Sequence, residues 1–138
     1  MITLRRAALV APFRTAVGTF GDTVGDLPVE DLGAAVMQLS GIGPDRGDDV
    51  LFAQADGNSE VPCVGRWLAL RAGLPTSDPC TQLDRWCGGG LQALVTAAMM
   101  VQTGAADAVL AGGVESMSRI EHYSKDARWE AERAPCRF

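Results

Sequence analysis

The chain has 138 residues, of which 47% are hydrophobic and 21% charged, and its net charge is −5. This length allows one domain with a real core, and the composition is that of a globular protein rather than a disordered one. Basic residues form no cluster beyond Arg5 and Arg6, which argues against a nucleic-acid-binding surface. The first apolar run is too short for a signal peptide or a membrane span, so we expect a cytoplasmic protein without a membrane partner.

Four cysteines stand at positions 63, 80, 87 and 136, and the chain has one histidine. No two cysteines have the CxxC spacing typical of zinc sites, so the sequence indicates no metal. A sparse, irregular set of this kind indicates reduced thiols. Cys63 and Cys80 are expected to pack in the interior.

The first half of the chain begins with an apolar run at residues 7–11, followed by Pro12, which predicts a buried strand. Residues 13–28 are rich in glycine and predict a loop. Residues 28–40 begin with a proline and carry acids in the first turn, which predicts an amphipathic helix. Residues 49–53 predict a second short strand.

The second half continues with a helix predicted over residues 61–72, ended by Gly73, and an extended segment over residues 79–86. Residues 88–103 predict a helix that is apolar nearly all round and therefore buried. Its core-facing set, chosen by helical spacing, is Leu94, Val95, Ala98 and Val101. Residues 106–111 predict a fourth strand.

Strands that alternate with helices at short connections indicate a parallel sheet with helices on its faces, the α/β class. Gly112 and Gly113 are expected to end the fourth strand. From residue 118 onward the chain is charged and has no apolar period.

The segment that holds the candidate reactive residue joins the third extended segment to the long helix. It reads DRWCGGGL. Cys87 is predicted to lie at the helix N-terminus, where free backbone N–H groups and the helix dipole stabilise an anion and so favour the reactive thiolate. The three glycines that follow, Gly88, Gly89 and Gly90, remove side chains from the approach to the sulfur and permit a tight turn. The alternative is a small buried cysteine beside a glycine-rich turn. A phosphate cradle is disfavoured because the GK[ST] ending is missing.

The stretches DRWCGGGLQAL and VQTGAADAVLAGGVESMSR resemble the segment around the nucleophile of thiolases, which are acyl-CoA acyltransferases. Residues 13–21, FRTAVGTFG, resemble the RTPxGxFGG loop of the same family. The resemblance covers roughly residues 5–129. It implies a three-layer α/β/α half of a thiolase, incomplete in this chain.

The resemblance further implies that Cys87 forms a thioester during acetyl transfer or 3-ketoacyl-CoA cleavage, and that its own backbone N–H supplies half of an oxyanion hole. Acyl-CoA and CoA would be the substrates, no further cofactor is needed, and homodimers or homotetramers are expected. The matched positions expected to support the site without taking part in the chemistry are Gly88, Gly89, Gly90, Gly112, Gly113, Glu115, Ser116 and Met117.

The sequence also departs from the family pattern. Thiolases often have Asn two or three residues before the cysteine, where this chain has Asp84 and Arg85. A carboxylate that points toward the thiol would disfavour the thiolate. Trp86 is bulky for a neighbour of a nucleophile, and Gly89 replaces a common serine.

The family's GHP histidine and its second, CGGGG cysteine do not occur in this chain. His122 stands in a polar stretch and is expected to be a solvated loop residue rather than the base. We therefore expect residues 1–117 to form a partial N-terminal domain and residues 118–138 to begin a loop insertion, with a foreign tail at 130–138. The expected function is that of a thiolase fragment that is inactive alone. A non-catalytic remnant and, less favoured, a ketoacyl-synthase-like enzyme are the alternatives.

Overall fold

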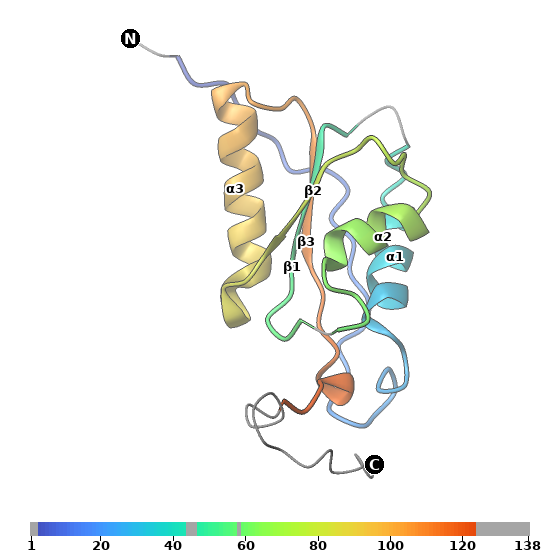
Figure 1. Cartoon of the computed structure of the whole chain (residues 1–138). Coiled ribbons are helices and arrows are strands. Elements are labelled where there is room, and N and C mark those ends of the chain that lie inside the picture. The colour runs from blue at the N-terminus through green and yellow to red at the C-terminus, as the bar shows by residue number, and fades with distance from the viewer. Residues whose placement is uncertain (1–2, 44–46, 58, 124–138) are drawn as a thin grey trace, which may run out of the picture.

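A computed structural model describes residues 3–43, 47–57 and 59–123 of the chain (Figure 1). The first helix, α1 (Val29–Leu39), begins directly after Pro28. The negative charges of Glu30 and Asp31 in its first turn stabilise it by interacting with the positive end of the helix dipole. Its buried side packs on α2 (Val64–Arg71). A Cβ built on Gly33 would lie 2.5 Å from Leu68 Cδ1, so the two helices come into close contact only because this position is a glycine.

The sheet has three described strands, all parallel, in the order β2-β1-β3. The central strand β1 (Asp49–Ala53) lies between β2 (Cys80–Leu83) and β3 (Val109–Gly113). Its last four residues are all buried, as expected for a strand covered on both faces. The predicted strand at residues 49–53 is therefore confirmed.

Helices cover both faces of this sheet (Figure 1). The long helix α3 (Gly89–Thr103) contacts β3 and β1, whereas α2 contacts β1 and β2 from the other face, with α1 packed beside it. Val64 and Leu68, on α2, are the largest fully buried side chains. The predicted three-layer α/β/α arrangement with a parallel sheet is thus confirmed. Among the described residues, no helix has the length and apolar content that spanning a bilayer would require.

The prediction that the long helix is buried was wrong. The buried positions of α3 are Gly89, Ala93 and Ala97, which are spaced by four residues and face the sheet. Leu91 and Met99 are 69% and 57% exposed. Only small side chains fit between α3 and the strands at this close approach, so the larger apolar residues lie outside the contact. The predicted core set of Leu94, Val95, Ala98 and Val101 is accordingly half-buried or exposed.

The predicted first strand does not form. Residues 7–11 form no strand, Ala11 has a φ of 49°, and Leu9 and Val10 are each 76% exposed. This segment is fixed nearby by the Arg5 N–H, which donates to the Gln102 carbonyl at 2.9 Å. An apolar run becomes a strand only when another strand offers it a ladder, and no described strand of this chain does so.

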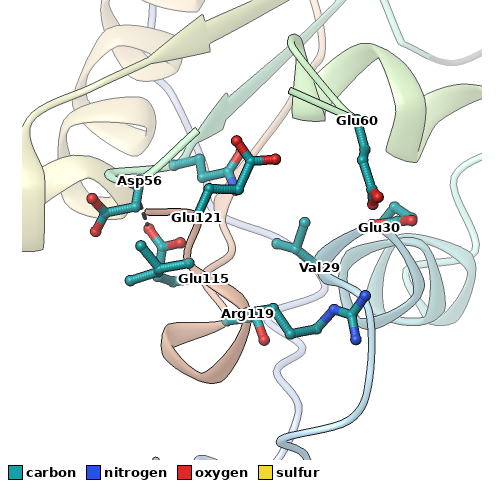
Figure 2. A pocket seen from close by; sticks show the side chains of 10 residues that line it. Val29, Glu30, Asp56, Glu60, Glu115, Arg119 and Glu121 are labelled. Atoms are coloured by element: carbon teal, nitrogen blue, oxygen red, sulfur yellow. Dashed lines mark hydrogen bonds between the residues drawn. The ribbon is translucent and has the colours of Figure 1, made fainter. Parts of the chain in front are cut away.

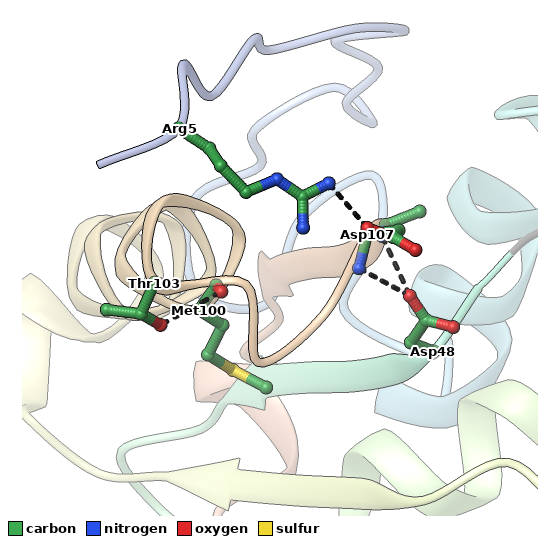
Figure 3. A network of polar contacts seen from close by, with 6 residues as sticks. Arg5, Asp48, Met100, Thr103 and Asp107 are labelled. Atoms are coloured by element: carbon green, nitrogen blue, oxygen red, sulfur yellow. Dashed lines mark hydrogen bonds and ion pairs between the residues drawn. The ribbon is translucent and has the colours of Figure 1, made fainter. Parts of the chain in front are cut away.

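Several boundaries of helices and strands differ from the predicted ones because of local hydrogen bonds. The fourth strand begins at Val109 rather than at residue 106, because the Asp48 carboxylate accepts the N–H groups of Asp107 and Ala108 at 2.6 and 3.0 Å (Figure 3). Arg5 pairs with Asp107 from the opposite side. That strand also runs on through the two glycines that were predicted to end it.

The second helix begins three residues later than predicted, at Val64, whose N–H donates to Gln82 Oε1 at 2.6 Å. The third extended segment ends as a strand at Leu83, because the chain turns from Asp84 onward.

Candidate active site

Cys87 lies in a single turn of 3-10 helix, Trp86–Gly88, that connects β2 to the start of α3. Its side chain is exposed. The helix proper begins two residues later, at Gly89, so the thiol lies at the N-terminal end of a 15-residue helix. This is the strand–turn–helix placement that the sequence predicted for the candidate nucleophile.

The turn before Cys87 is closed by side-chain and backbone hydrogen bonds. The Trp86 N–H donates to Asp84 Oδ1 at 2.9 Å, and the Gly88 N–H donates to the Arg85 carbonyl at 3.1 Å. Trp86 has φ of 50°, in the left-handed region that non-glycine residues rarely adopt. Its indole is 81% exposed. The Asp84 carboxylate, which the sequence suggested could oppose the thiolate, is thus engaged by the backbone of the turn.

The predicted supporting glycines mostly gather where α3 crosses the ends of β1 and β3. A Cβ on Gly89 would lie 2.7 Å from the Ala53 Cβ, and one on Gly113 would lie 3.1 Å from the Gly90 Cα. A Cβ on Gly112 would lie 2.7 Å from Phe52 Cζ. Gly89 and Gly113, the latter against Gly90, therefore allow the start of the helix to rest directly on the strands, whereas Gly112 leaves room for the Phe52 ring.

The fifth glycine, Gly88, is different, because a Cβ there would meet only the Arg85 side chain at 3.9 Å.

Glu115 fastens the loop after β3 to the loop after β1. Its Oε2 accepts the N–H groups of Ala55 and Asp56 at 2.8 and 3.1 Å. Ser116 Oγ donates to the Leu27 carbonyl at 3.5 Å, whereas Met117 is 58% exposed. Glu115 and Ser116 thus join segments that are distant in sequence.

An acidic pocket of about 110 Å³ lies beside this loop, and the sequence gave no sign of it (Figure 2). Gln54 lines it and is 4% exposed, and its Oε1 has no hydrogen-bond partner within the described part of the chain. Hydrogen bonds from the Ser59 hydroxyl and N–H lower the pKa of Glu121. Among the described residues, no three acidic, cysteine or histidine side chains come close enough to hold a metal ion. The pocket is lined by Val29, Glu30, Gln54, Asp56, Glu60, Glu115, Ser116, Arg119, Ile120 and Glu121.

A larger, mostly apolar groove of about 820 Å³ runs between residues 9–20, α1 and the end of β3. Gly90, Gly112 and Gly113 line it, but Cys87 does not. The groove was missed because residues 7–11 were assigned to a buried strand rather than to a groove wall.

The remaining candidates lie away from the thiol. His122 is exposed and makes no hydrogen bond to Cys87 within the described residues. Cys80 packs against the core, and burial raises the pKa of its thiol, which fits a packing role. Cys63 is half-buried at the start of α2. Residues 124–138, with Cys136 and the hypothesised foreign tail, lie outside the described part.

The chain is similar to known proteins in both sequence and structure. It is 38% identical over 127 residues to an acetyl-CoA acetyltransferase of Chromobacterium violaceum, covering 88% of this chain and 32% of that protein. It is 36% identical over 134 residues to the beta-ketothiolase BktB of Cupriavidus necator, covering 92% of this chain and 34% of that protein.

The crystal structure of the Bacillus anthracis acetyl-CoA acetyltransferase superposes with a TM-score of 0.85 at 30% identity, covering 92% of this chain and 33% of that one. The chain thus spans about a third of the length of the relatives it matches. The model of the thiolase N-terminal domain matches residues 7–135. With its three-layer fold and its cysteine turn, the chain belongs to the thiolase family and corresponds to the N-terminal domain.

Proposed function

We propose that this domain supplies the acyl-accepting nucleophile, Cys87, of an acyl-CoA C-acyltransferase of the thiolase type. The observation that carries the proposal is the exposed thiol one turn before α3, on a helix start that glycines hold against the strands. The helix N-terminus favours the thiolate, which is the form that attacks. The printed names of the relatives, acetyl-CoA acetyltransferase and beta-ketothiolase, agree with this class of reaction.

The proposed first step is transfer of an acyl group from CoA to the protein. The Cys87 sulfur attacks the thioester carbonyl, and the resulting oxyanion is stabilised by backbone N–H donors, including that of Cys87. The carbon–sulfur bond to CoA then breaks, CoA leaves as a thiol with the proton taken from Cys87, and a cysteine thioester remains. In the synthetic direction, the acyl group next passes to the α-carbon of a second acyl-CoA, which loses a proton, and the Cys87 thiol is regenerated. In the degradative direction, the sulfur instead attacks the 3-keto carbonyl of a 3-ketoacyl-CoA, the bond between the α- and β-carbons breaks, acetyl-CoA leaves once its α-carbon is protonated, and CoA then takes the acyl group from Cys87.

Acid–base help for these steps has to come from elsewhere in the enzyme. Among the described residues, no side chain hydrogen-bonds the Cys87 thiol, and His122 is exposed without a contact to it. We propose that a histidine and a second cysteine, in the GHP and CGGGG motifs of the resemblance, complete the site. Acyl-CoA and CoA are the proposed substrates, no further cofactor is required, and a homodimer or homotetramer is the proposed assembly.

The test is to incubate the 138-residue chain with acetyl-CoA and to map acetylated cysteines by mass spectrometry of peptides. We expect acetyl on Cys87, lost in Cys87→Ala and retained in Cys63→Ser, a control that removes a half-buried thiol. A full-length relative treated in parallel shows that the conditions support transfer. If that relative is acetylated and this chain is not, the chain is a non-catalytic remnant and the proposal is wrong.

A further inference from the structure

The connection before Cys87 contains a strained residue that one side chain supports. Trp86, with φ of 50°, is one of two non-glycine residues with positive φ in the described part of the chain. This conformation costs free energy for any residue with a Cβ, and such strain persists only where the surroundings hold it. The Trp86 indole is 81% exposed, so packing of the ring does not hold it. Two hydrogen bonds remain: the Gly89 N–H donates to the Trp86 carbonyl, and the Trp86 N–H donates to Asp84 Oδ1 at 2.9 Å, which is the one that a side chain supplies.

We infer that Asp84 is a positioning residue for Cys87: its side-chain oxygen, rather than its charge, keeps Trp86 in the left-handed region and so delivers the thiol to the start of α3. An aspartate that accepts the N–H two residues ahead forms an Asx turn, which imitates a backbone turn. Without that acceptor, no side-chain hydrogen bond offsets the free-energy cost of positive φ at Trp86. Cys87 then follows the backbone away from the helix N-terminus.

The two sides of the turn are fastened independently, which isolates the part played by Asp84. The Gly88 N–H donates to the Arg85 carbonyl at 3.1 Å, and the Arg85 guanidinium contacts Gln92 Oε1 in the first turns of α3. These contacts fix Arg85 relative to the helix but do not involve the Trp86 N–H. The Gly89 N–H holds the Trp86 carbonyl, so the Trp86 N–H is the part of that residue's backbone that depends on Asp84.

This assignment separates geometry from charge, because asparagine offers the same acceptor oxygen without the negative charge. Asp84→Asn keeps the Asx turn, whereas Asp84→Ala removes it. Glycine at position 86 adopts positive φ at no steric cost, so Trp86→Gly makes the support unnecessary. An effect of Asp84→Ala should therefore vanish in the background of Trp86→Gly.

The experiment measures the rate of Cys87 alkylation by iodoacetamide at neutral pH, resolved by peptide mass spectrometry so that the other thiols do not interfere. The variants are Asp84→Ala, Asp84→Asn, Trp86→Gly, the double variant Asp84→Ala with Trp86→Gly, and Asp78→Ala. Asp78 precedes β2 at the opposite end of that strand and serves as the matched loss of one carboxylate. Circular dichroism confirms that each variant is folded.

We expect Asp84→Ala to slow alkylation by about threefold to tenfold, the range that loss of one hydrogen bond allows. Asp84→Asn and Asp78→Ala should stay within about twofold of the parent, and the double variant within about twofold of Trp86→Gly. Equal slowing by Asp84→Asn and Asp84→Ala would overturn the inference, because asparagine keeps the acceptor oxygen, and faster alkylation in both would indicate a charge effect instead. Equal slowing by Asp84→Ala in both backgrounds, or no slowing at all, would also overturn it.

If Asp84→Ala does not fold, the comparison of Asp84→Asn with the parent still decides, because slowing by Asn contradicts a role for the oxygen alone. The inference rests on the proposed role of Cys87 for its meaning, but alkylation needs no acyl transfer. A chain that is never acetylated but shows the expected alkylation pattern would refute the proposed function and leave the positioning role of Asp84 standing.

Discussion

The contact between the start of α3 and the central strand leads to a paired prediction about two adjacent glycines. Gly89 is buried, and a Cβ there would lie 2.7 Å from the Ala53 Cβ. Ala53 is 4% exposed on β1, so neither atom belongs to a flexible side chain that could turn away. At the next position, Gly90, a Cβ would lie 3.9 Å from the nearest atoms, those of Gly113, which is an ordinary contact.

The magnitudes follow from two opposing effects. Replacing glycine by alanine in a helix stabilises it by up to about 1 kcal/mol, and less in the first turn. Ordinary carbon–carbon contacts lie near 3.5–4.0 Å, so Gly89→Ala would force the helix and the strand apart by about 1 Å, and overpacking of this kind costs about 1–3 kcal/mol. We expect Gly89→Ala to destabilise the chain by about 1 kcal/mol, and Gly90→Ala to stabilise it by about 0.5 kcal/mol.

Urea unfolding followed by far-ultraviolet circular dichroism measures both variants against the parent. The two substitutions are chemically identical and adjacent, so their difference reports the contact with Ala53 rather than helix propensity. If Gly89→Ala proves as stable as Gly90→Ala, α3 does not rest on β1 in the way described. The double substitution Gly89→Ala with Ala53→Gly provides the complement, because removing the opposing Cβ should abolish the difference between the two positions.

Three further predictions concern the loops and the chain as a whole. Glu115→Ala should lower the free energy of unfolding by about 1 kcal/mol, because it strands two backbone N–H groups, and Glu115→Gln should lose less; thermal melting checks both. Backbone hydrogen bonds from Ala108 and Asp107 lower the pKa of Asp48 below its ordinary 3.8. The Asp48 carboxylate therefore stabilises the folded chain at higher pH, and this stabilisation is lost as the pH falls through the lowered pKa. Asp48→Asn should therefore lose less stability than the parent between about pH 6 and about pH 3 in urea titrations. The 138-residue chain alone should show no acetoacetyl-CoA thiolysis above background, and turnover that depends on Cys87 would contradict this.

Local sequence patterns were enough for the elements with strong local signals. The proline before α1 and the acids in its first turn, the apolar run of β1 and the glycine that ends α3 each predicted a boundary that the structure confirms within a residue or two. Gly104, with φ of 80°, ends α3 as a left-handed cap. In these places the information that decides the conformation lies within a few residues of the boundary.

The failures share a different cause, which is dependence on distant partners. An apolar run at residues 7–11 is compatible with a strand, but in the described chain it pairs with neither edge strand, β2 or β3. Hydrophobicity likewise pointed to Leu94 and Val95 as the core face of α3. The short distance between α3 and β1 selects Ala93 and Ala97 instead. Periodicity reports which residues are apolar, whereas the spacing between layers decides which sizes fit.

The site shows the same division between local and distant information. The cysteine, the glycines after it and the helix that follows were predicted together, because a strand–turn–helix connection is local. The sequence could name Asp84 as a departure but not assign it a part, since a carboxylate three residues before a thiol can either oppose the thiolate or hold the turn. The hydrogen bond to the Trp86 N–H and the positive φ of that residue decide between these roles. A charge that the sequence alone would count against the nucleophile thus becomes the acceptor that places it.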